Sequence, residues 1–304
     1  MSTIGGAISG AIRGERPIAS GTNGERRPLA LLFLMLLWLS LLIAIGVLVT
    51  LIVTIVVEGQ GQFSWRLFTK FPASSPDRAG ARPAILGSAW VIGTTAVMTI
   101  PLGIAAAVHL EEFADKKNWF NRVIELNVQN LAAVPSIVYG LLALAFLSML
   151  GVRDKNIVIA GALALSLLIL PVIIIATREA LRAVPSEIRQ GSLALGASPW
   201  QTVWRQVLPS SVPGIATGAI LALSRALGEA APLLVLGALV FVSFDPNGLL
   251  SGYTTLPIQI FNWTGRPQEG FHQLAAATSV LLLGLLVVMN ALAIFIRNKS
   301  QKRW

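Results

Sequence analysis

The stretch REALRAVPSEIRQGSLALGASPWQTVWRQVLPSSV, residues 178–212, is a charged loop between two segments that are apolar enough to cross a membrane. Six of its side chains carry a charge, so we expect the loop to lie in water. Proline, glycine and serine stand in it at positions that start and stop helices. The stretch therefore predicts an ordered docking element at a membrane surface, with an ordinary amphipathic loop as the alternative.

The helix signals inside residues 178–212 predict two short helices. Pro185 suits the first position of the first helix, and Gly196 can end that helix with a left-handed turn. Ser198 and Gln201 have the spacing of a capping box, which marks the start of the second helix. Pro209 is expected to stop the second helix, because a proline removes one helical hydrogen bond.

The composition is that of a chain with several membrane helices. Hydrophobic residues make up 55% of the 304 residues and charged residues only 12%, about half the usual share in soluble domains. Residues 28–57 are thirty positions without a charge, whereas about 20 apolar residues span the hydrocarbon core. The apolar windows together predict six spans, of which the fifth is interrupted by charges: 28–57, 83–110, 126–150, 156–177, 213–244 and 274–296.

The distribution of positive charge predicts the orientation, because Lys and Arg favour the cytoplasmic side of a membrane. With the N-terminus inside, fifteen Lys and Arg residues fall on the cytoplasmic side and seven on the external side. We therefore expect both termini and residues 178–212 in the cytoplasm, with 1–27 as a disordered tail and 298–304 as a short tail. The net charge of +9 follows from this asymmetry, and no soluble basic face indicates a nucleic-acid partner.

Motifs for catalysis and metal binding are missing from the sequence. None of the six lysines follows a glycine, so the chain lacks the phosphate-cradling loop of many ATPases. It has no cysteine, and its two histidines, His109 and His272, lie in different segments. We expect no catalytic residue, no metal site and no cofactor in this chain; any ATP and Mg²⁺ would be bound by a partner.

Two charges interrupt the fifth apolar segment. Arg225 and Glu229 lie well inside it, and an arginine at the centre of a membrane helix costs roughly 2.5–3.5 kcal/mol on insertion scales. Their i, i+4 spacing predicts that both project from one face of a helix. One interpretation is a self-neutralising ion pair that fixes packing. The other is a polar pathway, since intramembrane charges usually face a cavity.

Three stretches resemble permeases of binding-protein-dependent ABC importers, and in particular phosphate-importer permeases of the PstA type. They are NLAAVPSIVYG at 130–140, ALSRALGEAAPLL at 222–234, and LPIQI at 256–260 followed by RPQE at 266–269. Residues 178–212 are similar to the EAA loop of these permeases. Its glycine, Gly196, and its final Leu-Pro, Leu208 and Pro209, match the pattern of that loop. Other residues stand at the three positions that name the motif: Gln190, Gly191 and Ser192.

The resemblance covers roughly residues 84–297 and implies an all-α integral membrane protein with six transmembrane helices and type I ABC-importer permease architecture. Residues 28–83 would hold the first helix and an external loop, and 84–297 the remaining five helices. Residues 178–212 would form a cytoplasmic coupling loop. Its residues that couple to an ATPase would be Gln190, Gly191, Ser192, Gly196, Leu208 and Pro209.

The resemblance also implies a location and partners. The chain would lie in a prokaryotic plasma (inner) membrane with a homologous permease of the PstC type, an ATPase dimer of the PstB type and an external phosphate-binding protein of the PstS type. Inorganic phosphate would move inward along a pathway that includes Arg225 and Glu229. Two alternatives stay open: a secondary transporter that works without an ATPase, and a permease for phosphonate, molybdate or sulfate.

Overall fold

The computed structural model describes residues 28–115, 117–238 and 241–300. Within these ranges the regular secondary structure is helical, apart from one isolated bridge between Ile157 and Gly252, and turns and irregular segments connect the helices. The expected tail at 1–27 and the last four residues of the expected tail at 298–304 lie outside the described residues. The elements are α1 (Pro28–Gly59), η1 (Gln60–Gln62), α2 (Trp65–Thr69), η2 (Pro76–Arg78), α3 (Arg82–Val108), η3 (His109–Phe113), α4 (Trp119–Leu131), α5 (Ser136–Met149), α6 (Val158–Arg182), α7 (Ser186–Ala194), α8 (Pro199–Thr202), η4 (Val203–Val207), α9 (Leu208–Leu227), α10 (Ala231–Val235), α11 (Leu256–Thr264) and α12 (Glu269–Ser300).

The chain divides into two compact units, Met1–Val53 and Thr54–Trp304. In the described part of the first unit, α1 exposes large apolar side chains from Leu31 to Val53 on every side. A helix that is hydrophobic all round needs an apolar environment on every face, which a lipid bilayer provides. The predicted first span, 28–57, is therefore confirmed as one long helix.

In the described part of the chain, five helices are long and apolar enough to cross a membrane, and the number of spans is six if the bent pair α4 and α5 counts as one. The number agrees with the sequence prediction, but the third predicted span is wrong as a continuous helix. Helices α4 and α5 meet at 113° across a break at residues 132–135. Pro135 has extended backbone at the start of α5 and has no N–H to continue the ladder of α4. The fifth span also differs, since its helix begins at Pro199 and ends at Leu227.

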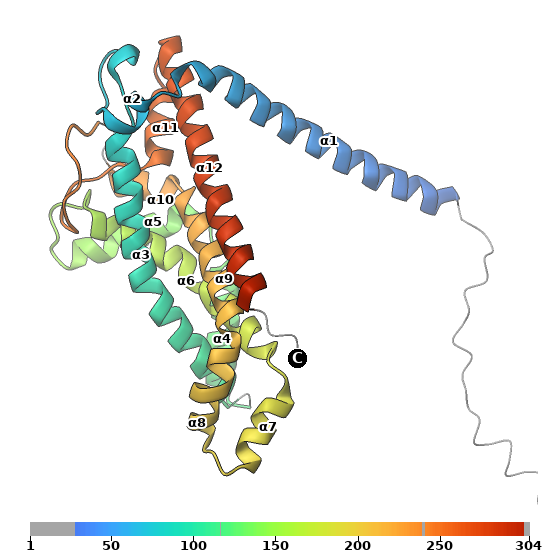
Figure 1. The fold of residues 1–304 in the computed structure, drawn as a ribbon. Coiled ribbons are helices and arrows are strands. Elements are labelled where there is room, and N and C mark those ends of the chain that lie inside the picture. The colour runs from blue at the N-terminus through green and yellow to red at the C-terminus, as the bar shows by residue number, and fades with distance from the viewer. Residues whose placement is uncertain (1–27, 116, 239–240, 301–304) are drawn as a thin grey trace, which may run out of the picture. The chain divides into compact units, whose positions relative to one another are not determined.

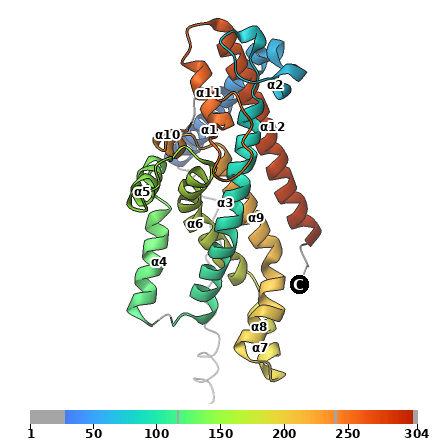
Figure 2. The same cartoon turned by 90° about the vertical axis from the view of Figure 1, so that its left-hand side faces the viewer.

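Within the second unit, α6 lies between α3 and α9 and forms the centre of the bundle (Figures 1 and 2). Leu165 and Ile169 on α6 are fully buried, and they pack in one cluster with Val91 on α3 and with Ala222 and Ala226 on α9. The small side chains on α9 let its backbone approach α6 closely. Gly218 is an example, because a Cβ there would lie 2.6 Å from the Cβ of Ala176 on α6.

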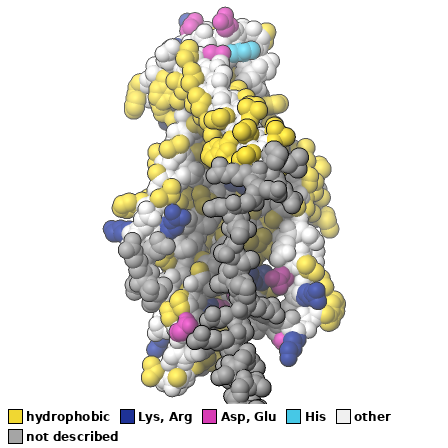
Figure 3. Space-filling view, turned by 90° about the vertical axis from the view of Figure 1, so that its right-hand side faces the viewer, with side chains coloured by type: hydrophobic (Ala, Val, Ile, Leu, Met, Phe, Trp, Pro, Cys, Tyr) yellow, Lys and Arg dark blue, Asp and Glu magenta, His cyan; other side chains and the backbone are white. Residues whose placement is uncertain are grey.

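The two ends of this bundle carry different elements. Helices α7 and α8 lie together at one end, and α2 and α11 lie at the other (Figures 1 and 2). On the face shown in Figure 3, most of the visible Lys and Arg side chains lie in the lower half, and Asp, Glu and His side chains lie at the top. The coupling loop, residues 178–212, lies at the end of the bundle that carries α7 and α8.

Candidate functional site

The first helix of the coupling loop, α7, ends as the sequence predicts. Pro185 is the residue just before the helix rather than its first residue, and Gly196 has a φ of +84° after the last turn. The N–H of Gly196 donates to the carbonyl of Leu193 at 3.0 Å, and the N–H of Ala197 donates to the carbonyl of Ser192 at 3.2 Å. This is a Schellman motif, whose left-handed residue is most easily a glycine. The turn fixes the direction in which the chain leaves α7.

The second helix starts as predicted but does not stop at Pro209. The N–H of Gln201 donates to Oγ of Ser198 at 3.2 Å, and the N–H of Ser198 donates to Oε1 of Gln201 at 2.9 Å, which completes the capping box. From α8 the helix continues through the π turn η4 into α9. The prediction of a stop at Pro209 is therefore wrong. In the wider π turn the N–H of Leu208 donates to the carbonyl of Val203, five residues earlier, and this local geometry accommodates the proline that follows.

A groove separates α7 from the α8–η4 helix. Its volume is about 440 Å³, and Oγ of Ser192 lies 2.9 Å from Oγ1 of Thr202 across its base. The lining residues are Glu187, Ile188, Gly191, Ser192, Leu195, Ala197, Gln201, Arg205 and Gln206. Of the predicted coupling residues, the structure brings Gly191 and Ser192 into this groove and leaves Gln190 exposed beside it on α7.

The other predicted coupling residues lie elsewhere. Leu208 is half-buried against an apolar cluster that contains Leu181, Val203 and Val207, and Pro209 is exposed at the start of α9. These two positions therefore do not share a surface with the groove. Leu208 packs the α8–α9 helix against Leu181 at the end of α6, whereas Pro209 is not part of this cluster.

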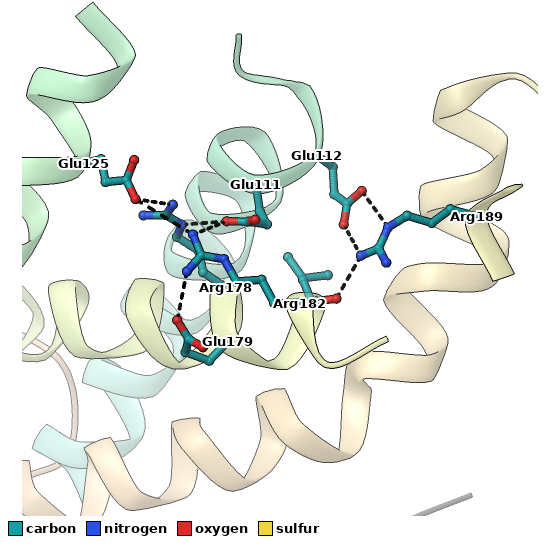
Figure 4. Close-up of polar contacts among 8 residues, drawn as sticks. Glu111, Glu112, Glu125, Arg178, Glu179, Arg182 and Arg189 are labelled. Carbon is teal, nitrogen blue, oxygen red and sulfur yellow. Dashed lines mark hydrogen bonds and ion pairs between the residues drawn. The ribbon is translucent and has the colours of Figure 1, made fainter. Parts of the chain in front are cut away.

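Charged side chains join the coupling loop to the ends of α3, α4 and α6 (Figure 4). Arg178, whose side chain is only 6% exposed, donates from Nε to Glu111 at 3.1 Å and from Nη2 to Glu125 at 2.7 Å. Arg182 adds a contact of 2.9 Å to Glu111. A buried guanidinium needs such partners, because an unpaired charge in a low dielectric is strongly destabilising. The residue pairs are 53 and 67 positions apart, so sequence spacing gave no signal for them.

Helix α5, which follows the break after α4, packs against helix α10, which follows the break after α9. Gly140 on α5 faces Pro232 on α10 so closely that a Cβ on Gly140 would lie 2.7 Å from the Pro232 carbonyl oxygen. Tyr139 is buried beside this contact and donates its hydroxyl to the carbonyl of Leu131 at 2.6 Å. The motif at 130–140 and the motif at 222–234 are therefore one site in space.

Arg225 and Glu229 lie at the edge of that site but not on one helix. Helix α9 ends at Leu227, and tight turns follow, with Gly228 N donating to Arg225 O and Glu229 N donating to Ala226 O. The prediction that both charges project from one helical face is therefore wrong, because the regular helix ends two residues before Glu229.

The ion pair between these two charges is also absent. The Arg225 side chain is exposed, and neither charge has an ion-pair or hydrogen-bond partner in the described part of the chain. A self-neutralising pair is thus not formed in this chain. An exposed guanidinium inside an apolar segment is unfavourable against lipid, so this face must meet something polar.

Comparison with known proteins places the chain among transporter permeases. The family model of the binding-protein-dependent transport system inner membrane component matches residues 99–302. The "Probable ABC transporter permease protein YqgI" of Bacillus subtilis is 35% identical over 230 residues, which cover 74% of this chain and 74% of that protein. The "Phosphate transport system permease protein PstA" of Mycobacterium leprae is 34% identical over 277 residues, 87% of this chain and 88% of that protein.

The fold agrees with this comparison. A solved bacterial alginate ABC transporter, in complex with an alginate pentasaccharide-bound periplasmic protein, contains a chain that aligns with a TM-score of 0.64 at 15% identity. The alignment covers 90% of the present chain and 96% of the transporter chain. The chain belongs to the binding-protein-dependent transport system inner membrane component family, that is, to the multi-pass permease subunits of ABC importers.

Proposed function

We propose that this chain is one permease subunit of an ATP-driven importer of inorganic phosphate. The observation that carries the proposal is the exposed, unpartnered guanidinium of Arg225 at the break between α9 and α10. Relatives that are 34–35% identical over most of the chain and bear the name PstA support phosphate as the substrate. The planar fork of donors on an arginine suits phosphate oxygens.

Glu229 has a separate role in this proposal. When the pathway is empty, its carboxylate offsets the net charge of this region without an ion pair to Arg225. When phosphate is present, the carboxylate accepts a hydrogen bond from a protonated phosphate oxygen. Sulfate carries no such proton at neutral pH, so Glu229 provides a chemical basis for discrimination between the two anions.

The expected partners follow from a missing sequence motif and from two exposed surfaces of this chain. It lacks a phosphate-cradling loop, so a separate ATPase dimer of the PstB type binds ATP and Mg²⁺ and docks on the groove between α7 and α8. The exposed Arg225 face forms half of the pathway, and a homologous permease of the PstC type provides the other half. An external binding protein of the PstS type delivers phosphate to the opposite end.

Reconstitution tests this function directly. The purified permease pair with its ATPase and external binding protein should take up phosphate into liposomes only when ATP is supplied on the ATPase side. Excess sulfate, molybdate or phosphonate should not compete. Uptake by the permease alone, without the ATPase, would instead identify a secondary transporter, and strong competition by another oxyanion would reassign the substrate.

The orientation is a further part of the proposal. The excess of Lys and Arg supports a cytoplasmic location for both termini and the coupling loop. A reporter fused after Lys117 should therefore read cytoplasmic, and one inserted between Thr69 and Arg82 should read external. Alkaline phosphatase and green fluorescent protein fusions measure the two cases, because each is active on only one side. The reverse pattern would overturn the orientation.

A further inference from the structure

The π turn η3, at the end of α3, contacts three other elements through three successive side chains. Glu111 pairs with Arg178 and Arg182 on α6. Glu112 pairs with Arg189 on α7, and the ring of Phe113 lies 5.7 Å from the ring of Trp200 on α8. Successive residues on a helix point in different directions, so one turn can reach several neighbours. Both helices of the coupling loop are thus held to the end of α3.

The contact between Glu112 and Arg189 is the strongest of these links to the coupling loop. Arg189 donates from Nη2 to Oε1 of Glu112 at 2.7 Å and from Nε to Oε2 at 3.3 Å. This is a two-pronged pair, the geometry that arginine favours with a carboxylate. The Glu112 side chain is 10% exposed and the Arg189 side chain 25% exposed, so water screens the pair only partly.

Arg189 also binds the end of α6. Its Nη1 donates to the carbonyl of Val184 at 2.7 Å, and its Nη2 donates to the carbonyl of Leu181 at 2.8 Å. Carbonyls at a helix C-terminus have no helical partner, and a cation there is favoured by the helix dipole. One guanidinium therefore joins α7, the last turn of α6 and the π turn at the end of α3 (Figure 4).

We propose that Arg189 is a positioning residue that couples α7 to α3: through Glu112 it makes the coupling helix and the end of α3 move as one body. The proposal rests on the proposed function, in which the ATPase dimer docks on the groove beside α7. Glu112 itself belongs to the π turn η3, and α7 contacts the second π turn, η4; such turns are frequent at functional sites. From η3 the movement reaches α4 through Glu111, Arg178 and Glu125.

The variant Glu112→Gln tests the coupling while it leaves the bonds of Arg189 to α6 in place. In the complete reconstituted transporter we expect ATP hydrolysis to continue, while phosphate transported per ATP falls at least about fivefold, the low end of typical coupling between sites. Arg189→Lys should lower this ratio less than Glu112→Gln does, since it keeps the charge but loses the fork. The matched control is Glu179→Gln, whose side chain is 65% exposed and which should leave the ratio unchanged.

A covalent bridge tests the same link from the opposite direction. The chain contains no cysteine, so Glu112→Cys with Arg189→Cys introduces the only two thiols in this subunit. The double variant should hydrolyse ATP with poor transport, and a short bismaleimide bridge between the two thiols should restore the transport ratio. An unchanged ratio in Glu112→Gln, or a bridge that blocks transport, would overturn the proposal.

Two further outcomes are also decisive. If Glu112→Gln fails to assemble with its partners at normal expression, the contact is structural and the positioning role is wrong. If the wild-type complex itself moves no phosphate with ATP, the proposed function fails, and this result is distinct because it appears before any variant is made.

Discussion

Replacing Gly196 by valine should uncouple ATP hydrolysis from phosphate uptake. Gly196 has a φ of +84°, and a β-branched residue in the left-handed region stores about 1–3 kcal/mol of strain. A Cβ at this position would meet no atom within 4 Å, so the strain would come from the backbone alone. We expect the Schellman turn to open and the angle between α7 and α8 to change, which would deform the groove that Gly191 and Ser192 line.

The size of this effect can be measured as phosphate uptake per ATP hydrolysed in proteoliposomes. The strain corresponds to a loss of roughly 5- to 150-fold if it acts entirely on the coupled state. Gly196→Asn is the matched control, because asparagine tolerates the left-handed region, and it should retain most transport. Gly191→Ala is a second control, since this residue lies in a helix with ordinary φ and open space around it. Normal transport in Gly196→Val at normal membrane abundance would contradict the prediction.

Local signals in the sequence predicted the turn that ends α7 and the capping box that starts α8. The left-handed turn at Gly196 and the capping box of Ser198 and Gln201 depend on a few neighbouring residues, and the structure forms both. The error at Pro209 has a local cause as well. A π turn inserts one residue into a helix, and no pattern of hydrophobicity or proline position distinguishes that insertion from a helix stop.

The links between elements could not be predicted in the same way. Glu112 and Arg189 are 77 positions apart, and nothing in either segment marks the other as its partner. The bend of 113° between α4 and α5 also escapes a count of apolar residues, because both halves are apolar and only Pro135 marks the break. The sequence therefore predicts the elements and their caps, whereas tertiary packing decides how they are joined.

Removal of the charges of Arg225 and Glu229 is expected to have the largest effect on transport. The structure forms no ion pair between them, so removal of both charges breaks no ion pair and leaves neither side chain without a former partner within this chain. If Arg225 binds phosphate, Arg225→Gln loses charge-assisted hydrogen bonds that are each worth about 1.5–3 kcal/mol. We expect phosphate uptake to fall by at least about tenfold, which corresponds to 1.4 kcal/mol, while the protein still inserts and assembles.

Three variants separate substrate binding from a packing role at this site. Arg225→Gln and the double change Arg225→Gln with Glu229→Gln should both show this loss of uptake, whereas Arg225→Lys should recover only part of it, because an ammonium lacks the two-pronged fork. A packing pair would behave differently: the double change would be tolerated better than either single change, since no charge is left alone in a low dielectric. Uptake is measured in cells that lack other phosphate carriers, with the membrane level of every variant checked. Because the exposed guanidinium has no partner in the described chain, wild-type transport by the double variant would remove the case for Arg225 as the phosphate ligand and assign it instead to the contact with the second permease.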